Sequence, residues 1–100
     1  RIKPPEGVTP EIRIAQHPIL AGLDTTWPSL LGFNELIAKP EAEVLATVGE
    51  YPLLVVWQYG EGRSLAWASD IGPHWCPTSF ATWDGYSRLW RQAITWLAGR

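Results

Sequence analysis

The central part of the chain alternates between apolar runs and turn residues in the manner of β-strands. Val44–Val48 forms one run, and Leu53–Tyr59 is almost entirely apolar, the pattern of a strand that is buried on both faces. The glycine-flanked stretch Gly60–Gly62 follows, and Ser64–Ser69 then alternates between apolar and polar residues. Two such runs joined by a short glycine-containing turn predict a β-hairpin.

The residues before this region predict only short elements. Proline and glycine interrupt the first ten residues, which favours an extended conformation there. The elements predicted from the pattern are an extended linker over 1–10, a short strand at Ile12 and Ile14, one helical turn within 17–23, a loop over 24–32 and a strand over Phe33–Ala38.

The end of the chain has helical periodicity. Asp84 is placed to cap the first turn of the helix, and Gly99 is placed to end the last turn. Trp90 lies near the middle of the apolar stripe and Trp96 lies at its edge. The apolar positions are 86, 89, 90, 93, 94 and 97, and the polar positions 88, 91, 92 and 95 occupy the opposite face. The pattern therefore predicts an amphipathic C-terminal helix.

Composition narrows the classes of function. The 100 residues carry 8 Lys and Arg against 10 Asp and Glu, a formal net charge of -2. This balance argues against a nucleic-acid or membrane-surface binder, because both need clustered cations. Hydrophobic residues make up 46% of the chain and include 7 Trp, whereas charged residues reach only 18%. The excess of hydrophobic over charged residues predicts either a self-contained Trp-rich core or apolar side chains that face a neighbouring chain or domain. Composition leaves both open.

The cysteine content and the first residue bear on cellular context. The chain begins with Arg1 and contains no Met, so we expect a processed product or a part of a longer polypeptide. Cys76 is the single cysteine, so no internal disulfide can form, which favours a cytoplasmic protein. The longest apolar run, Leu53–Trp57, is far shorter than the ~20 residues that span a bilayer, so we expect no membrane partner.

Polar and reactive side chains concentrate in 70–83, a predicted loop that directly follows a strand. Loops in this position commonly carry the sites of α/β proteins. His74 is the best candidate for acid–base chemistry near neutral pH. The alternative is a structural histidine that packs on Trp75 and bonds to a backbone carbonyl. Asp70 and Trp75 are the candidate binding residues beside His74.

Other candidates for chemistry are weaker. Cys76 lies two residues from His74, but Pro77 restricts its backbone and no glycine elbow exposes the thiol, so a catalytic cysteine is disfavoured. Two histidines and one cysteine show no recognised metal-ligand spacing, and we expect neither a metal nor a cofactor. His17, which precedes Pro18, is expected to be structural. The Trp residues fit a core better than a ligand groove.

Several stretches in register resemble one family. They are His17–Leu23, Gly32–Asn34 with Ala38–Leu45, Pro52–Leu54 with Tyr59–Ala66, Ser69–Trp75, and Trp83–Tyr86 with Leu89–Ala93 and Trp96–Gly99. Their order and spacing are similar to the C-terminal part of the glutamine amidotransferase-like proteins. These belong to the class I glutamine amidotransferase-like superfamily, which also includes the ThuA-like proteins.

The resemblance implies a flavodoxin-like α/β sandwich, to which this chain would contribute a β-meander and the C-terminal amphipathic helix. It divides the chain into a linker over 1–16 and the C-terminal portion of the domain over 17–100, with the N-terminal half absent. The missing half or a separate partner chain would then complete the sandwich. A homo-oligomer is a further arrangement that would cover apolar surface.

The resemblance also implies a chemistry. In class I amidotransferases a cysteine on a strand–turn–helix elbow in the N-terminal half is the nucleophile, and a histidine and a glutamate follow a late strand. His74 occupies the region of that histidine, but Trp75 and Cys76 follow it, so the His-x-Glu pair is lacking.

Two hypotheses about function follow from these observations. The first is amide hydrolysis by a thiol outside this segment, with His74 as base. The second is a non-catalytic small-ligand-binding or assembly module with the same fold, because a fold does not determine a function. A cysteine on an elbow upstream of Arg1 would favour the enzyme, and its absence would favour the module.

Overall fold

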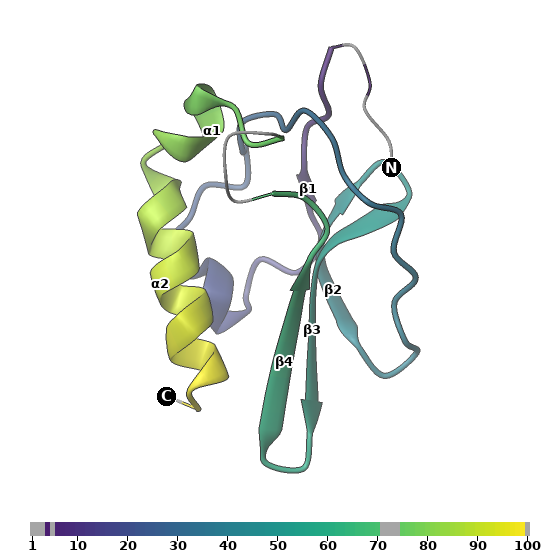
Figure 1. The fold of residues 1–100 in the computed structure, drawn as a ribbon. Helices are drawn as coiled ribbons and strands as arrows, with labels where there is room; N and C mark the ends of the chain where they lie inside the picture. Colours follow the sequence, from purple (N-terminus) through teal and green to yellow (C-terminus); the bar gives the residue numbers. More distant parts are fainter. Residues whose placement is uncertain (1–3, 5, 71–74, 100) are drawn as a thin grey trace.

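The computed structural model describes residues 4, 6–70 and 75–99 of the chain. A β-sheet forms one layer, and the C-terminal helix lies beside it in a second layer, where it contacts the last strand (Figure 1). The elements in chain order are β1 (Glu11–Ile12), the 3-10 helix η1 (Pro18–Leu20), β2 (Glu43–Val48), β3 (Tyr51–Tyr59), β4 (Gly62–Trp67), α1 (Thr78–Ala81) and α2 (Gly85–Leu97).

The strands form one antiparallel sheet in the order β1-β2-β3-β4, so each strand pairs with its neighbour in the sequence. The predicted hairpin is confirmed: Tyr59 pairs with Gly62, which leaves Gly60 and Glu61 as the turn. Gly60 adopts a φ of +60°, a left-handed conformation that glycine takes without steric cost. The chain is thus a small α/β unit in which a β-meander precedes the terminal helix, as predicted.

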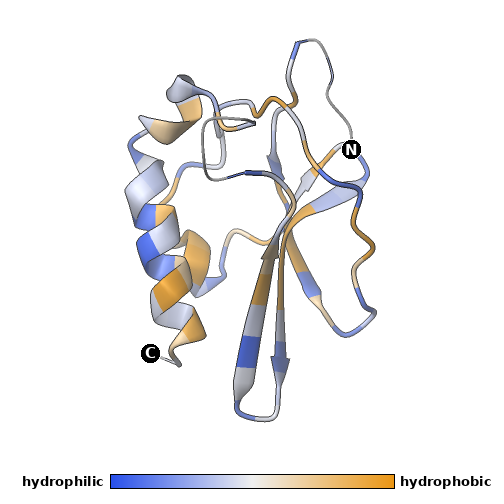
Figure 2. Cartoon of the chain, viewed as in Figure 1, coloured by the Kyte–Doolittle hydropathy of each residue, from blue (hydrophilic) through white to orange (hydrophobic). Residues whose placement is uncertain are grey.

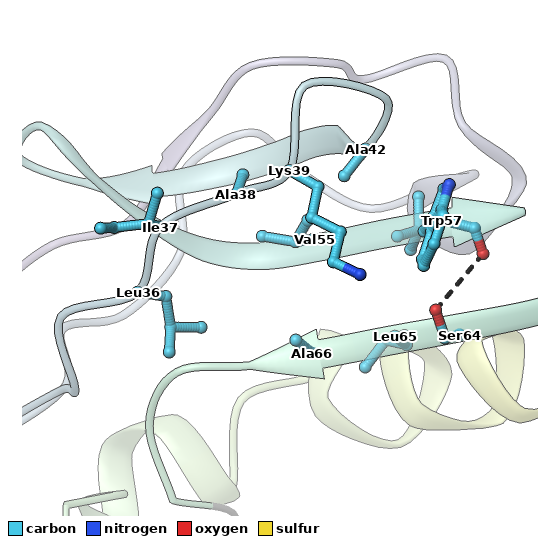
Figure 3. A pocket seen from close by; sticks show the side chains of 11 residues that line it. Leu36, Ile37, Ala38, Lys39, Ala42, Val55, Trp57, Ser64, Leu65 and Ala66 are labelled. Carbon is cyan, nitrogen blue, oxygen red and sulfur yellow. Dashed lines mark hydrogen bonds between the residues drawn. The ribbon is translucent and has the colours of Figure 1, made fainter.

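The predicted strand over Phe33–Ala38 is wrong. This described stretch forms no strand of the sheet and instead crosses one face of β3 and β4 (Figure 3). Phe33 is buried against Tyr51, and the Asn34 N–H donates to the Ala68 carbonyl at 2.7 Å. Leu36 packs across the strands rather than beside them, whereas Ile37 is 97% exposed, so a β-like composition does not lead to strand pairing here.

β3 is buried on both faces only over its middle. Leu53 and Leu54, which point to opposite faces, are both fully buried, whereas Gln58 and Tyr59 at the hairpin end are exposed. Figure 2 shows the same change, because the hairpin is hydrophobic near the other strands and hydrophilic toward its tip. The prediction of burial on both faces therefore holds for the middle of the strand and fails at its end.

The C-terminal helix α2 begins at Gly85 and ends at Leu97. Gly99 ends it as predicted, with a φ of +82° and an N–H that donates to the Trp96 carbonyl at 2.9 Å. The prediction that Asp84 caps the first turn is wrong. Its side chain makes no capping hydrogen bond, and its backbone is already helical rather than extended.

The buried face of α2 is rotated from the predicted apolar stripe. Ile94 is 68% exposed although the periodicity places it on the apolar face. Trp96, predicted at the edge, is buried because the His17 ring packs edge-on against it and the Arg63 guanidinium lies over its ring. The residues that α2 buries are Gly85, Leu89, Ala93 and Trp96.

Candidate functional site

The predicted site lies where β4 ends and the chain continues toward α1 (Figure 1). His74, the predicted base, lies outside the described residues, as do 71–73. The structure therefore describes only the two residues on either side of this segment, Asp70 and Trp75, which are called its flanks below.

The first flank is held firmly by hydrogen bonds. The Ser69 hydroxyl donates to the Gly32 carbonyl at 2.6 Å, and the Trp67 indole N–H donates to the Asp70 carbonyl at 3.3 Å. Asp70 therefore leaves the sheet from a fixed point at the end of β4. A fixed backbone is what a site needs to keep a charged group in place.

The second flank, Trp75, is buried against residues 31–32, and the first flank is bonded to Gly32 of the same pair. A Cβ on Gly32 would lie 2.8 Å from the Trp75 indole nitrogen, so only glycine allows ring and backbone to approach so closely. The Trp75 carbonyl also accepts a hydrogen bond from the Leu31 N–H at 2.8 Å. Residues 31–32 thus anchor both ends of the segment that carries the predicted base. The binding role of Trp75 stays a prediction.

Cys76 is a buried free thiol. Burial raises its pKa, and the negative charge of Asp70 raises it further. The nucleophilic form of cysteine is the thiolate, so a buried thiol with a raised pKa is poorly suited to attack a substrate at neutral pH. The structure thus agrees with the sequence in disfavouring a catalytic Cys76.

The segment after the predicted site is not all loop, because it contains the short helix α1. Phe80 on α1 is fully buried and lies at the centre of an aromatic cluster. Its ring lies between 5.4 and 6.4 Å, centroid to centroid, from the rings of Trp27, Trp67, Trp83 and Tyr86. These contacts hold α1 against the sheet. Most Trp side chains belong to the core or pack against it, as predicted: Trp27, Trp67, Trp83, Trp90 and Trp96.

His17 has the structural role that the sequence predicts. Its Nδ1 accepts a hydrogen bond from the Ile19 N–H at 3.2 Å and so caps η1, while its ring meets Trp96 with centroids 5.1 Å apart. Burial lowers the pKa of His17; the charge of Glu43 opposes this change and the charge of Arg63 adds to it. A neutral imidazole is the form that accepts the hydrogen bond.

An apolar groove of about 330 Å³ lies on the face of β3 and β4 that Figure 3 shows. Val55, Trp57 and Ala66 form its floor, and Leu36 and Lys39 belong to the segment that borders it. The Lys39 ammonium lies 4.4 Å from the centroid of the Trp57 ring, a cation–π contact.

Sequence reasoning missed this groove. The only sign of it in the sequence is the alternation along Leu53–Tyr59, which places Val55 and Trp57 on one face of β3. The prediction that Phe33–Ala38 is a strand put the bordering segment in the sheet rather than across it. The groove is therefore a product of tertiary packing.

Metal ligation finds no support in the part of the chain that the structure describes. There, no three side chains of His, Cys, Asp or Glu come together in a group that could hold an ion. None of the described helices is long and apolar enough to cross a membrane.

These features define a small α/β unit whose candidate site follows the last strand of an antiparallel sheet. The chain matches the family described as "Putative glutamine amidotransferase" over residues 1–99. It therefore belongs to this glutamine amidotransferase-like family, and the resemblance found in the sequence is confirmed. None of the curated proteins matches the chain.

Two solved structures from Salmonella typhimurium are similar to this chain. "Cytoplasmic Protein STM3548" is 32% identical with a TM-score of 0.89, and "Cytoplasmic Protein STM1381", from strain LT2, is 34% identical with a TM-score of 0.89. Each match covers 96% of this chain and 39% of the other chain. The chain thus spans about two fifths of the length of these relatives.

Proposed function

We propose that this chain is part of a glutamine amidotransferase-like protein that hydrolyses an amide with a thiol nucleophile supplied from outside the segment. The family match over residues 1–99 is the observation that carries this proposal. The meander and α2 would form one part of a flavodoxin-like sandwich of the kind found in ThuA-like proteins. Both solved relatives are named cytoplasmic proteins, which supports a cytoplasmic location.

In the proposed reaction this chain supplies the base, and the rest of the protein supplies the thiol nucleophile. The thiol gives its proton to the base, and the thiolate attacks the carboxamide carbon. The amide nitrogen takes up this proton and leaves as ammonia, and water then hydrolyses the thioester to the carboxylic acid and the free thiol. His74 would act as the base that takes the proton and later delivers it. The raised pKa of the buried Cys76 thiol supports a nucleophile from elsewhere.

Asp70 and Trp75 would position the groups that react. Asp70 leaves a rigid strand end four residues before His74, and its negative charge would stabilise the positive charge that a base acquires when it takes a proton. Trp75 is itself buried, so it would fix the end of the wall of the site through the hydrogen bond from the Leu31 N–H to its carbonyl. Both roles require the flanks to stay anchored on residues 31–32.

Ammonia release from glutamine tests this proposal. The protein to use is a polypeptide with the length of the solved relatives that contains this chain. We expect His74→Ala to lower kcat by about 100-fold or more, as is usual for loss of a general base. Cys76→Ala, the matched control, should keep the wild-type rate. Wild-type turnover in His74→Ala would remove His74 from the mechanism, and loss of turnover in Cys76→Ala would place the nucleophile in this segment.

A second candidate function is a non-catalytic module that binds a small ligand, and the groove beside Trp57 favours it. The apolar floor and the Lys39 ammonium suit a ligand with an apolar body and an anionic group. In the same ammonia assay this module predicts no release above background from the wild-type protein. Ammonia release that depends on His74 would exclude it as the main function.

A further inference from the structure

The groove beside Trp57 exists because small side chains stand opposite larger ones on one face of the hairpin. Val55 of β3 is paired with Ala66 of β4, and Trp57 is paired with Ser64. Side chains that are paired across two strands point to the same face of the sheet. Ala66 and Ser64 are both exposed, so they leave a hollow of about 330 Å³ on this face.

The segment that borders the groove holds a cation at one end of it. Leu36 packs against the hydrophobic core, which fixes the start of this border. The Ala42 N–H donates to the Lys39 carbonyl at 2.9 Å, which fixes its other end in a turn. The Lys39 ammonium then lies 4.4 Å from the centroid of the Trp57 ring. The positive charge is therefore kept over the groove rather than in open solvent.

The two ends of the groove differ in polarity (Figure 3). Lys39 and Ser64 lie beside Trp57 at one end, whereas Leu36 and Ala66 lie toward the other. The Ser64 hydroxyl reaches the Trp57 carbonyl only at 3.5 Å, which is long for a hydrogen bond between two oxygens, so it is available to a better acceptor. The groove thus combines an end that carries two donors with an apolar end.

The charge at the polar end is not neutralised within the described part of the chain. The ion pair found there joins Arg13 to Glu11, and no described carboxylate pairs with Lys39. The described residues that line the groove include no Asp or Glu, although the chain as a whole has a formal net charge of -2. A partly enclosed ammonium attracts an anion more strongly than one in bulk water. Charge complementarity therefore favours an anionic ligand at this end.

The size and lining of the groove restrict the rest of the ligand. Small-molecule sites measure ~300–1,000 Å³, so this groove suits a short ligand. Leu36, Val55 and Ala66 offer an aliphatic lining, which suits an alkyl chain.

We propose that the groove binds a short-chain aliphatic carboxylate. Its alkyl chain covers Val55 and Ala66, and its carboxylate accepts hydrogen bonds from the Lys39 ammonium and the Ser64 hydroxyl. The inference rests on the second candidate function and names the ligand class and the groups that hold it. It does not depend on amide hydrolysis.

Titration with octanoate, followed by NMR of isotope-labelled indole N–H groups, tests the proposal. The protein is the polypeptide with the length of the solved relatives that contains this chain, and Trp57→Phe identifies the Trp57 signal. We expect this signal to shift and to saturate. Octanol and octylamine have the same alkyl chain but lack the negative charge. They should bind at least ~10-fold more weakly, because they cannot form the charge-assisted hydrogen bond with Lys39.

Two variants separate the charge from the apolar lining. Lys39→Met removes the ammonium and should weaken octanoate by about 10-fold while leaving octanol unchanged. Arg91→Met, which removes an exposed cation on α2, is the matched control and should leave both affinities unchanged. Ala66→Leu should weaken both ligands by at least ~10-fold, because the larger side chain fills the groove. Ala66 is exposed, so this variant should fold, and unchanged signals from the buried Trp27 and Trp96 verify that it does.

Three results would overturn the proposal, and each has a different meaning. Equal affinity for octanoate, octanol and octylamine would show that the groove binds alkyl chains without selecting an anion, which leaves the second candidate function with another ligand class. Binding that persists in Ala66→Leu would place the ligand elsewhere. A Trp57 signal that no probe shifts would contradict both the inference and the groove as a ligand site. If Ala66→Leu does not fold, the contrast between octanoate and octanol in Lys39→Met decides the question. Ammonia release is not measured, so failure of the catalytic proposal leaves these results unaffected.

Discussion

His17 shows how a single buried titratable side chain connects the two ends of the described fold. Its Nδ1 caps η1 near the start of the chain, and its ring packs against Trp96 in the last helix. The sequence predicts a structural role from the His-Pro pair alone, but it does not reveal the contact with Trp96. That contact depends on how η1 docks on α2, which is a tertiary arrangement.

We expect the chain to lose stability as the pH falls below 6.5, the ordinary pKa of histidine. Burial lowers the pKa of His17 in the fold, so the unfolded chain binds the proton first. The contribution of His17 is therefore fully present above pH 6.5 and is lost as the pH falls toward the lower pKa of the folded state. The loss is at most about 1.4 kcal/mol per pH unit.

Urea unfolding at about pH 7.5 and about pH 5.5 measures this loss. His17→Asn is the matched variant, because its side-chain oxygen can still cap η1 but does not titrate. The free energy of unfolding should fall more steeply in the wild type than in the variant. Parallel decreases in the two proteins would show that other groups cause the acid sensitivity.

Gly32 is the second residue whose role depends on a distant partner. We expect Gly32→Ala to lower the free energy of unfolding by about 1–3 kcal/mol, because the new Cβ would lie 2.8 Å from the Trp75 indole. Gly62→Ala is the control, since its nearest neighbour would be a backbone oxygen at 3.4 Å. Urea unfolding of both variants checks this, and equal losses would contradict the assigned close approach.

At the level of secondary structure, the elements predicted correctly are those whose signals are local. The β3–β4 hairpin has a glycine turn between two apolar runs, and α2 has a clear helical period. Phe33–Ala38 has a similar composition, and a turn at Lys39–Ala42 leads from it into β2, yet it borders the groove on one face of β3 and β4 instead of pairing with a strand. Phe80 holds α1 in place through buried aromatic contacts that are not evident from a loop-like sequence.

The rotated face of α2 leads to a prediction that separates its two apolar sides. Leu89→Ala should lower the free energy of unfolding of the 100-residue chain by about 2–5 kcal/mol, because Leu89 is fully buried. Ile94→Ala should change it by no more than about 0.5 kcal/mol, because Ile94 is 68% exposed. Thermal or urea unfolding measures both. A large loss in Ile94→Ala would mean that the Ile94 side chain is covered within this chain.

For the molecule as a whole, the family and the α/β class could be predicted from the sequence. The groove at Trp57 and the anchoring of the candidate site could not. Motifs in register are a property of the sequence, and the family match confirms the resemblance they carry. The groove at Trp57 and the anchoring of both site flanks on residues 31–32 involve segments far apart in the chain. His74 stays a prediction, because it lies outside the described residues.

The order of the strands also bears on how the fold assembles. The turns between β2 and β3 and between β3 and β4 are both tight, so pairing these strands restricts little chain and costs little loop-closure entropy. β1 pairs with β2 only after a long loop has closed, since Glu11 lies opposite Thr47. Contacts close in sequence form faster than distant ones. The meander from Glu43 to Trp67 is therefore the part of the molecule expected to form first, and β1 is expected to join it later.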